Sequence, residues 1–233
     1  MKLAVVTGGT RGIGRAIAAR AVAAGYRVIA AARHPPVAQL PDNTIFTACD
    51  VADRGSVDAL FAPLRQIDAL ITCAGLAGAN RLDGDDALWH AIVASNLHGT
   101  YYCCKAAIPR LTDGAGRIVT MASVLGLAGV PDQTAYCAAK HGVVGLTRAL
   151  ALALAPRGIT VNALCPGWVA TGMAEQRFRE LGIAVEDAAG GVPTGRIVTV
   201  DEVAELAAFL LSPASRSITG QALAIDGGAL ARV

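Results

Sequence analysis

Short runs of small and apolar residues alternate along this chain with longer segments in which apolar residues recur every three or four positions. The short runs predict strands buried on both faces, and the longer segments predict amphipathic helices. The predicted strands cover residues 2–6, 26–32, 44–48, 68–72, 117–121, 159–164 and 222–225, and the predicted helices cover 13–24, 56–64, 86–111, 134–155 and 201–211. This alternation predicts an α/β fold: a doubly wound, Rossmann-like parallel sheet in three α/β/α layers.

Two segments depart from this alternation. Pro35, Pro36 and Pro41 interrupt the short connection between the second and third strands, so we expect a loop there in place of a crossover helix. From about 172 to 199 the periodicity loosens, and glycines stand at positions 182, 190, 191 and 195. We expect this segment to be a mobile substrate lid on a single dinucleotide-binding catalytic domain that spans residues 1–233.

Composition and charge narrow the function. The 233 residues are 54% hydrophobic and 16% charged, and a net charge of +2 is spread over scattered acids and bases, which favours neither a nucleic-acid partner nor a membrane surface. No apolar run reaches spanning length, and the Met-Lys start leads directly into a strand. The six cysteines lack the spacing of a metal site. We therefore expect a cytoplasmic protein without a metal.

A glycine-rich loop follows the first strand and opens a helix. It has the spacing G-x-x-x-G-x-G, which allows a tight turn and brings backbone N–H groups at the helix N-terminus close to a pyrophosphate. An ordinary glycine turn is the alternative, but the strand before it and the helix after it favour a dinucleotide site. The predicted cofactor contacts in this loop are Gly8, Thr10, Arg11, Gly12, Ile13 and Gly14.

The ends of the next strands predict the cofactor and further contacts to it. The second strand ends in Ala32-Arg33-His34, where many dinucleotide domains place an acid for the ribose 2′-hydroxyl. Arg33, together with Arg11, can instead receive a 2′-phosphate, so NADP(H) is preferred and NAD(H) is the alternative. Both arginines could also be solvated surface charges. Asp50 and Val51 follow the third strand, where the adenine can be met, and the small-residue turn Cys73-Ala74-Gly75 follows the fourth.

Tyr136 and Lys140 lie four residues apart in the predicted helix 134–155 and therefore on one helix face. The reference pKa of a phenol is about 10, and a neighbouring ammonium favours the charged form. The pair can thus exchange protons with a substrate. A chance pair on a helix surface is the competing interpretation, which the other motifs make less favourable.

The assembled motifs resemble those of the short-chain dehydrogenase/reductase family over essentially the whole chain, most of all the 3-oxoacyl-thioester reductases and related ketoreductases. The matching residues are Thr7–Gly14, Asn96, Ser123 with Tyr136 thirteen residues later, Lys140, Pro166-Gly167 and Thr171. One motif departs from the family: N-N-A-G stands here as Thr72-Cys73-Ala74-Gly75. Other groups or water must therefore replace the hydrogen bonds of two Asn side chains.

The resemblance implies a catalytic set of Asn96, Ser123, Tyr136 and Lys140. Tyr136 is expected to exchange a proton with the carbonyl oxygen, and Ser123 to hydrogen-bond the same oxygen. Lys140 is expected to lower the phenol pKa and to hold the nicotinamide ribose, and Asn96 to hold a water linking Lys140 to solvent. In the cofactor site, Pro166, Gly167, the Val169 backbone and Thr171 are expected to lie near the nicotinamide carboxamide.

The family layout also places a substrate pocket among residues 76–79, 124–127, 131–133, Trp168 and 173–185, most of which are apolar. We expect an NADPH-dependent reduction of a 3-oxoacyl thioester or a hydrophobic cyclic or polyketide-like ketone. Arg157, Arg177 and Arg179 are candidates to meet the phosphate of a phosphopantetheine or CoA. The alternatives are an NAD-dependent secondary-alcohol or 3-hydroxyacyl-CoA dehydrogenase and, in a different class, a cofactor-sensing module without turnover.

The resemblance implies a homotetramer. The predicted helices 86–111 and 134–155 carry apolar residues on more of their circumference than packing on one sheet face requires. The residues expected to face a partner subunit are Leu97, Tyr101, Cys104, Val144, Leu150 and Leu154.

Overall fold

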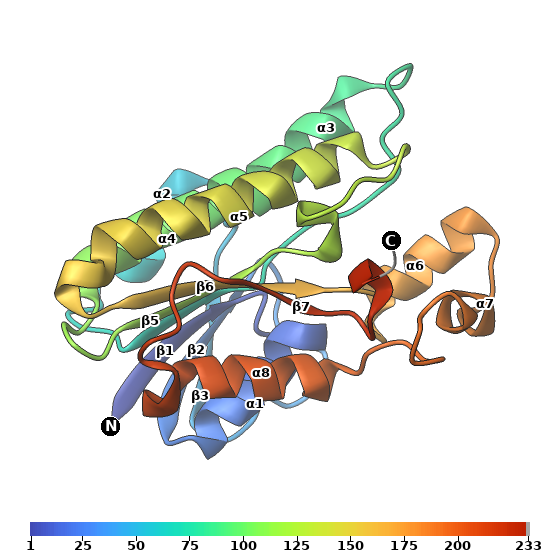
Figure 1. The fold of residues 1–233 in the computed structure, drawn as a ribbon. Coiled ribbons are helices and arrows are strands. Elements are labelled where there is room, and N and C mark those ends of the chain that lie inside the picture. Colours follow the sequence, from blue (N-terminus) through green and yellow to red (C-terminus); the bar gives the residue numbers. More distant parts are fainter. Residues whose placement is uncertain (232–233) are drawn as a thin grey trace.

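The computed structural model describes residues 1–231, and its centre is one sheet of seven parallel strands (Figure 1). The strands are β1 Lys2–Thr7, β2 Tyr26–Ala32, β3 Thr44–Ala48, β4 Ala69–Thr72, β5 Arg117–Met121, β6 Thr160–Pro166 and β7 Ala222–Ile225. Their order is β3-β2-β1-β4-β5-β6-β7, so the winding reverses between β1 and β4. This confirms the doubly wound sheet, and such reversal points are where ligands bind, at the carboxyl ends of the strands.

Helices cover both faces of the sheet (Figure 1). α1 (Gly12–Ala23) and α8 (Val200–Leu211) lie on one face, where they pack on Ala4 and Val6 of β1. α2 (Arg54–Phe61), α4 (Gly99–Ala107) and α5 (Thr134–Leu154) lie on the other face, against Val5. Because side chains alternate along a strand, consecutive residues of β1 serve two separate cores, which explains its unbroken apolar run.

The helix predicted over residues 86–111 is not continuous. It divides into α3 (Asp86–Val93), a π-helical turn η1 (Ala94–His98), α4 and a 3₁₀ turn η2 (Ile108–Arg110). The Asn96 Nδ2 atom donates to the carbonyl oxygens of Ile92 (2.9 Å) and Leu76 (2.7 Å), and Thr100 Oγ1 donates to the Asn96 carbonyl oxygen (2.7 Å). These side-chain bonds occupy backbone acceptors that the α-helical ladder would use, and π turns of this kind are frequent at functional sites.

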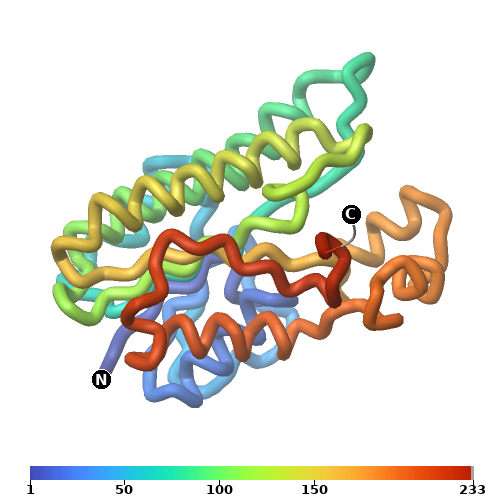
Figure 2. The backbone as a smooth tube through the Cα atoms, viewed as in Figure 1, coloured from blue at the N-terminus to red at the C-terminus, as the bar shows by residue number. Residues whose placement is uncertain are grey.

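The segment predicted to lack regular structure holds two helices, α6 (Gly172–Leu181) and α7 (Val185–Gly190). Thr171 caps α6 by accepting from the Ala174 N–H (3.3 Å), and Gly182 ends it at φ 65°. The ring centroids of Phe178 and Trp168 are 4.9 Å apart. Both helices are short, so tertiary packing of this kind stabilises them, which sequence periodicity does not show. They project beyond the carboxyl ends of the strands (Figure 2).

Other boundaries depend on capping residues. α8 begins after Thr199, which forms a reciprocal capping box with Glu202. α2 begins two residues before the predicted start because Asp53 accepts from the Gly55 N–H (2.9 Å). The connection from β2 to β3 contains no helix, as predicted.

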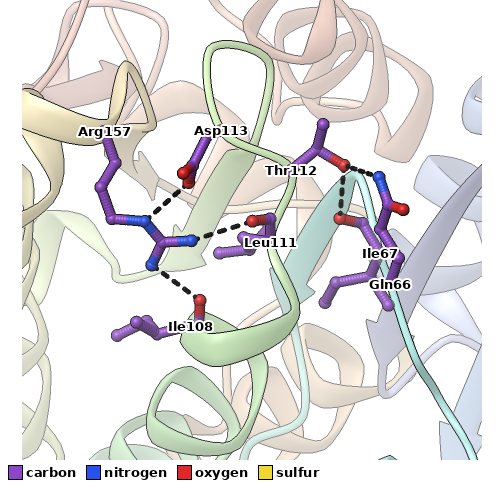
Figure 3. A network of polar contacts seen from close by, with 7 residues as sticks. All are labelled: Gln66, Ile67, Ile108, Leu111, Thr112, Asp113 and Arg157. Atoms are coloured by element: carbon purple, nitrogen blue, oxygen red, sulfur yellow. Dashed lines mark hydrogen bonds and ion pairs between the residues drawn. The ribbon is translucent and has the colours of Figure 1, made fainter.

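Arg157 precedes β6, so it lies at the amino ends of the strands and not at their carboxyl ends. Its guanidinium donates to Asp113 Oδ1 (2.7 Å) and to the carbonyl oxygens of Ile108 (2.9 Å) and Leu111 (2.9 Å) (Figure 3). The prediction that it meets a substrate phosphate is therefore wrong. Arg157 joins the chain after α4 to the chain after α5.

Within residues 1–231, only the helix that continues through Thr134–Arg157 has the length and composition of a membrane span. Here it packs along the sheet, and Ala135, Ala139 and Val143 are completely buried in the protein core.

Candidate active site

The side chains of the predicted catalytic set meet at the carboxyl end of the sheet. Ser123 follows β5, Tyr136 and Lys140 stand on the first two turns of α5, and Asn96 lies in η1. The Lys140 ammonium is 5.3 Å from the centroid of the Tyr136 ring and donates to the Met121 carbonyl oxygen (2.7 Å). The Ser123 hydroxyl lies close enough to the Tyr136 phenol to lower the pKa of that phenol. The i, i+4 spacing therefore places the phenol and the ammonium as predicted.

Ser123 is held in place by the chain that follows it. Its Oγ atom caps the 3₁₀ turn η3 (Val124–Gly126) by accepting from the Leu125 N–H (3.1 Å). A hydroxyl that accepts one backbone bond retains its own hydrogen for donation. Ser123 can therefore donate to an oxygen beside Tyr136, which is the role of a preorganised donor where negative charge develops.

The ionisation of the pair differs from the prediction. Burial raises the pKa of Tyr136 to about 12, although the hydrogen bond from Ser123 lowers it in part. Burial also lowers the pKa of the Lys140 ammonium to about 8. The expected lowering of the phenol pKa by Lys140 is thus not found in this structure, where desolvation by burial is the largest influence on the Tyr136 pKa. At neutral pH both groups hold their protons, so the phenol can act as an acid.

Asn96 and Lys140 face the same small space above Gly75. A methyl group added at Gly75 would lie 2.6 Å from Asn96 Oδ1 and 3.9 Å from Lys140 Nζ. The two bonds of Asn96 Nδ2 fix the amide orientation, and Oδ1 has no hydrogen-bond partner among residues 1–231. An acceptor and an ammonium across a glycine are the arrangement that the predicted water link requires. Gly75 is thus needed for its lack of a side chain.

The glycine loop forms a compact cradle at the N-terminus of α1. Gly8 has φ 67°, and a methyl group there would lie 2.8 Å from the Ala74 nitrogen; one at Gly14 would lie 2.3 Å from the Gly8 carbonyl oxygen. α1 has no side-chain cap at Arg11 and no acid in its first turn. The first N–H groups of α1, which include those of Gly12 and Ile13, are therefore available to a phosphate. Thr10 lies in the same loop.

Thr7, the first residue of the glycine motif, has a structural role that the motif alone did not predict. Its Oγ1 atom accepts from the Ala74 N–H (3.2 Å), and its carbonyl oxygen accepts from the Cys73 N–H (3.1 Å). These bonds fasten the turn in which both family Asn side chains are missing. Burial raises the pKa of the Cys73 thiol to about 12, so it stays neutral near Lys140.

The candidate 2′-phosphate contacts are exposed and unopposed. Arg33 lies just beyond the β2 residue Ala31, which pairs with Thr7, so it flanks the glycine loop. Both Arg11 and Arg33 are exposed, and no ion pair within residues 1–231 involves either of them. Asp50 is half-buried; its Oδ1 atom accepts from the Ala52 N–H (3.0 Å), which leaves its second oxygen for an adenine amino group. Val51 is buried beside it.

The side of the cradle that is predicted to receive the nicotinamide is built from the end of β6, which includes Pro166. The Gly167 N–H donates to the Ile225 carbonyl oxygen (3.0 Å), and Val169 forms a parallel bridge with Val198. Thr171 Oγ1 donates to the Val169 carbonyl oxygen (3.2 Å), and its methyl group would lie 3.6 Å from a methyl group at Gly12. Thr171 therefore stands between the glycine loop and the first turn of α6.

A family model described as Enoyl-(Acyl carrier protein) reductase matches residues 8–229. The chain belongs to the short-chain dehydrogenase/reductase family. It is 38% identical over 238 residues to 3-oxoacyl-(acyl-carrier-protein) reductase FabG of Haemophilus influenzae, with 97% of each chain covered. Ligand-free aldohexose dehydrogenase of Thermoplasma acidophilum matches with a TM-score of 0.93 at 32% identity, over 100% of this chain and 95% of that one. An actinorhodin polyketide ketoreductase with NADPH matches with a TM-score of 0.88 at 35% identity, over 98% and 97%.

Membership of this family makes the protein an NAD(P)-dependent oxidoreductase that interconverts CH–OH and C=O groups. The residues present fit a dinucleotide: glycines too crowded for side chains, a free helix N-terminus and a loop without acids lie at one edge of the sheet. The reacting set lies at the same edge.

On the substrate side of the site, the structure corrects the prediction for one residue. Arg177 on α6 is buried and pairs with Asp132, and it also donates to Glu180 Oε2 (3.1 Å). The prediction that it meets a substrate phosphate is therefore wrong, because two carboxylates already neutralise it. Arg179 is exposed and keeps that candidate role.

Three of the six residues expected to face a partner subunit lie in the core of the subunit itself. Cys104, Val144 and Leu154 are 1%, 4% and 5% exposed, so that expectation is wrong for them. Leu97 and Leu150 are half-buried, and Tyr101 is 43% exposed. Leu152, which the sequence analysis omitted, is 80% exposed on α5.

Proposed function

We propose that this protein reduces a hydrophobic ketone to a secondary alcohol with NADPH. The preferred substrates are a 3-oxoacyl thioester and a cyclic or polyketide-like ketone. One observation carries the proposal: a protonated Tyr136 phenol and the Ser123 hydroxyl stand together beside the glycine cradle. The similarity to a 3-oxoacyl reductase and a polyketide ketoreductase supports the substrate class.

When bound, the reduced nicotinamide supplies the hydride that reaches the carbonyl carbon. Tyr136 then gives its hydroxyl proton to the carbonyl oxygen, while Ser123 donates a hydrogen bond to the same oxygen. Lys140 holds the ribose hydroxyls. It also returns a proton to the Tyr136 phenolate, and solvent then reprotonates Lys140 through a water held by Asn96 Oδ1 in the space above Gly75. The glycine loop and the α1 N-terminus hold the pyrophosphate.

The preference for NADPH rests on charge. A 2′-phosphate carries nearly two negative charges, and Arg33 and Arg11 offer two exposed guanidinium groups without a competing acid. Ala32 stands where an acid would repel the phosphate. NAD(H) lacks the phosphate and therefore gains nothing from these arginines.

The preference for an uncharged ketone rests on the substrate side. Trp168, Phe178 and Ile183 supply apolar surface near the lid, and the buried cation Arg177 is already paired. A small free acid would find no available buried partner here.

An NAD-linked secondary-alcohol or 3-hydroxyacyl-CoA dehydrogenase is the second candidate, and the likeness to an aldohexose dehydrogenase favours it. The same Tyr136 would then accept a proton, which requires the phenolate. A cofactor-sensing module without turnover is a third class, and the assembled catalytic set speaks against it.

We further propose a cytoplasmic homotetramer that uses the exposed Leu152 and Tyr101 in its contacts.

A substrate panel monitored by NADPH absorbance tests the proposal. Acetoacetyl thioesters, cyclic diketones and aryl ketones should include at least one substrate that the wild type reduces and that Tyr136→Phe does not. A parallel panel of secondary alcohols with NAD⁺ tests the second candidate. Turnover of alcohols with NAD⁺ but of no ketone with NADPH would overturn the reductive assignment.

A further inference from the structure

Arg177 is a buried cation held between two acids of different origin. Its side chain is 11% exposed, against 36% for Asp132 and 30% for Glu180. Glu180 lies three residues further along the same helix, α6. Asp132 lies in the loop that precedes α5, 45 residues earlier in the chain. The Arg177–Glu180 pair stays within the lid, and the Arg177–Asp132 pair joins the lid to the body of the protein.

Asp132 is in turn fixed to the start of the catalytic helix. Its carbonyl oxygen accepts from the Asn80 N–H (2.7 Å). The buried Asn80 side chain accepts through Oδ1 from Thr134 Oγ1 (2.7 Å) and from the Ala135 N–H (3.3 Å). Thr134 and Ala135 are the first residues of α5, immediately before Tyr136. A continuous chain of polar contacts therefore runs from α6 to the turn that carries the phenol.

The rest of the lid is held mainly by apolar packing and by its two ends. Phe178 packs against Trp168, and Val198 pairs with Val169 at the return to the sheet. Of the ion pairs within residues 1–231, Arg177–Asp132 alone joins the lid to the loop before α5. It is thus the ion pair that fixes α6 relative to this loop.

We propose that Arg177 and Asp132 form a latch that holds the lid closed over the substrate pocket and keeps the start of α5 in place. Both are positioning residues, and their effect on catalysis rests on the reductase function proposed above. Glu180 moves with Arg177 when the lid moves, so that pair neutralises the cation without opposing opening. The Asp132 pair breaks on opening, and the loss of this charge-assisted hydrogen bond in a partly buried place favours the closed position.

The two acids supply a matched pair of variants. Asp132→Asn removes the carboxylate charge across the latch, and Glu180→Gln removes one carboxylate charge from the same guanidinium within the helix. Both changes are isosteric at partly exposed side chains, so both proteins should fold. Loss of one charge-assisted bond should shift the opening equilibrium about tenfold in Asp132→Asn, and less than about twofold in Glu180→Gln.

Limited proteolysis of the full-length protein measures opening without any substrate. Chymotrypsin cleavage at Phe178 or Leu181 should be about tenfold faster in Asp132→Asn than in the wild type or Glu180→Gln. Asp132→Asn combined with Arg177→Gln should cleave no faster than Arg177→Gln alone. Once a ketone that the wild type reduces is known, Asp132→Asn should raise the KM for that ketone more than it lowers kcat.

Equal cleavage rates in Asp132→Asn and Glu180→Gln would overturn the latch, and so would additive effects of the two latch substitutions. A wild type that reduces no ketone, with cleavage rates that differ as expected, would refute the proposed function and leave the latch standing. The two ideas can therefore fail separately.

Discussion

Lys140→Met should lower the catalytic activity but raise the free energy of unfolding. The variant therefore tests directly whether the buried Lys140 ammonium is unfavourable for folding. The Lys140 side chain is 4% exposed, and its ammonium donates to one carbonyl oxygen, that of Met121. No ion pair within residues 1–231 neutralises it. Methionine has a similar length and carries no charge, so it removes the buried cation while it fills much of the same space.

The size of the effect follows from the pKa. A fall from the ordinary 10.5 to about 8 corresponds to about 3 kcal/mol of unfavourable burial of the charged form. Loss of the hydrogen bond to Met121 costs about 1 kcal/mol. The variant should therefore gain about 2 kcal/mol, which for a chain of this length is a rise in Tm of about 4–8 °C at neutral pH.

The pH dependence has a definite sign. The native pKa lies below the unfolded one, so between about 8 and 10.5 the unfolded state binds more protons and wild-type stability rises with pH. The stability advantage of Lys140→Met should therefore be complete below pH 8 and should shrink as the pH approaches 10.5. Lys105→Met, at an exposed lysine, is the control and should show neither effect.

Thermal unfolding of the wild type and both variants at about pH 7 and about pH 10 measures these differences. A Lys140→Met protein that is less stable than the wild type at pH 7 would refute the reasoning. So would an advantage that does not change with pH. The first result would mean that Lys140 has a favourable partner, and the second that its charge is not the cause.

Four further predictions concern single residues. Tyr136→Phe keeps the ring but removes the proton donor, so turnover should fall by at least about a hundredfold while NADPH fluorescence titration shows unchanged binding. Arg33→Ala should erode a preference for NADPH of about ten- to a hundredfold by raising the KM for NADPH alone, and added salt should weaken the same preference in the wild type. Gly75→Ala places a methyl group 2.6 Å from Asn96 Oδ1, so kcat should drop with the helix content of the circular dichroism spectrum unchanged. Leu152→Glu, at an 80% exposed position, should lower the mass measured by light scattering if α5 forms the proposed tetramer contact.

Local geometry could be predicted from the sequence where the spacing of residues determines it. The Tyr136–Lys140 pair required only a helix, and the glycine loop required only a strand before it and a helix after it. Each of these features depends on residues that are neighbours in the chain, and for that reason each was found in the expected place.

Features that depend on distant contacts could not be predicted in this way. The π turn at Asn96 requires the Leu76 carbonyl oxygen from another loop, which supplies the second bond of the amide. α6 requires Trp168 for its packing, so its residues read as an irregular segment when taken alone. Cys104 was misplaced toward a partner because composition does not tell the sheet-facing side of α4 from its outer side.

The pKa values of Tyr136 and Lys140 could not be predicted from the sequence either, and they bear on the direction of the reaction. Spacing alone suggested that Lys140 would lower the phenol pKa. Both groups are buried, however, and burial raises the pKa of Tyr136 to about 12 and lowers the pKa of Lys140 to about 8. In the free protein at pH 7 the site therefore holds two protons next to the place of the carbonyl oxygen. Reduction consumes a proton at that oxygen, whereas oxidation must begin by removing one from a buried phenol. The resting protonation state thus favours the reductive direction, and oxidation should require a higher pH.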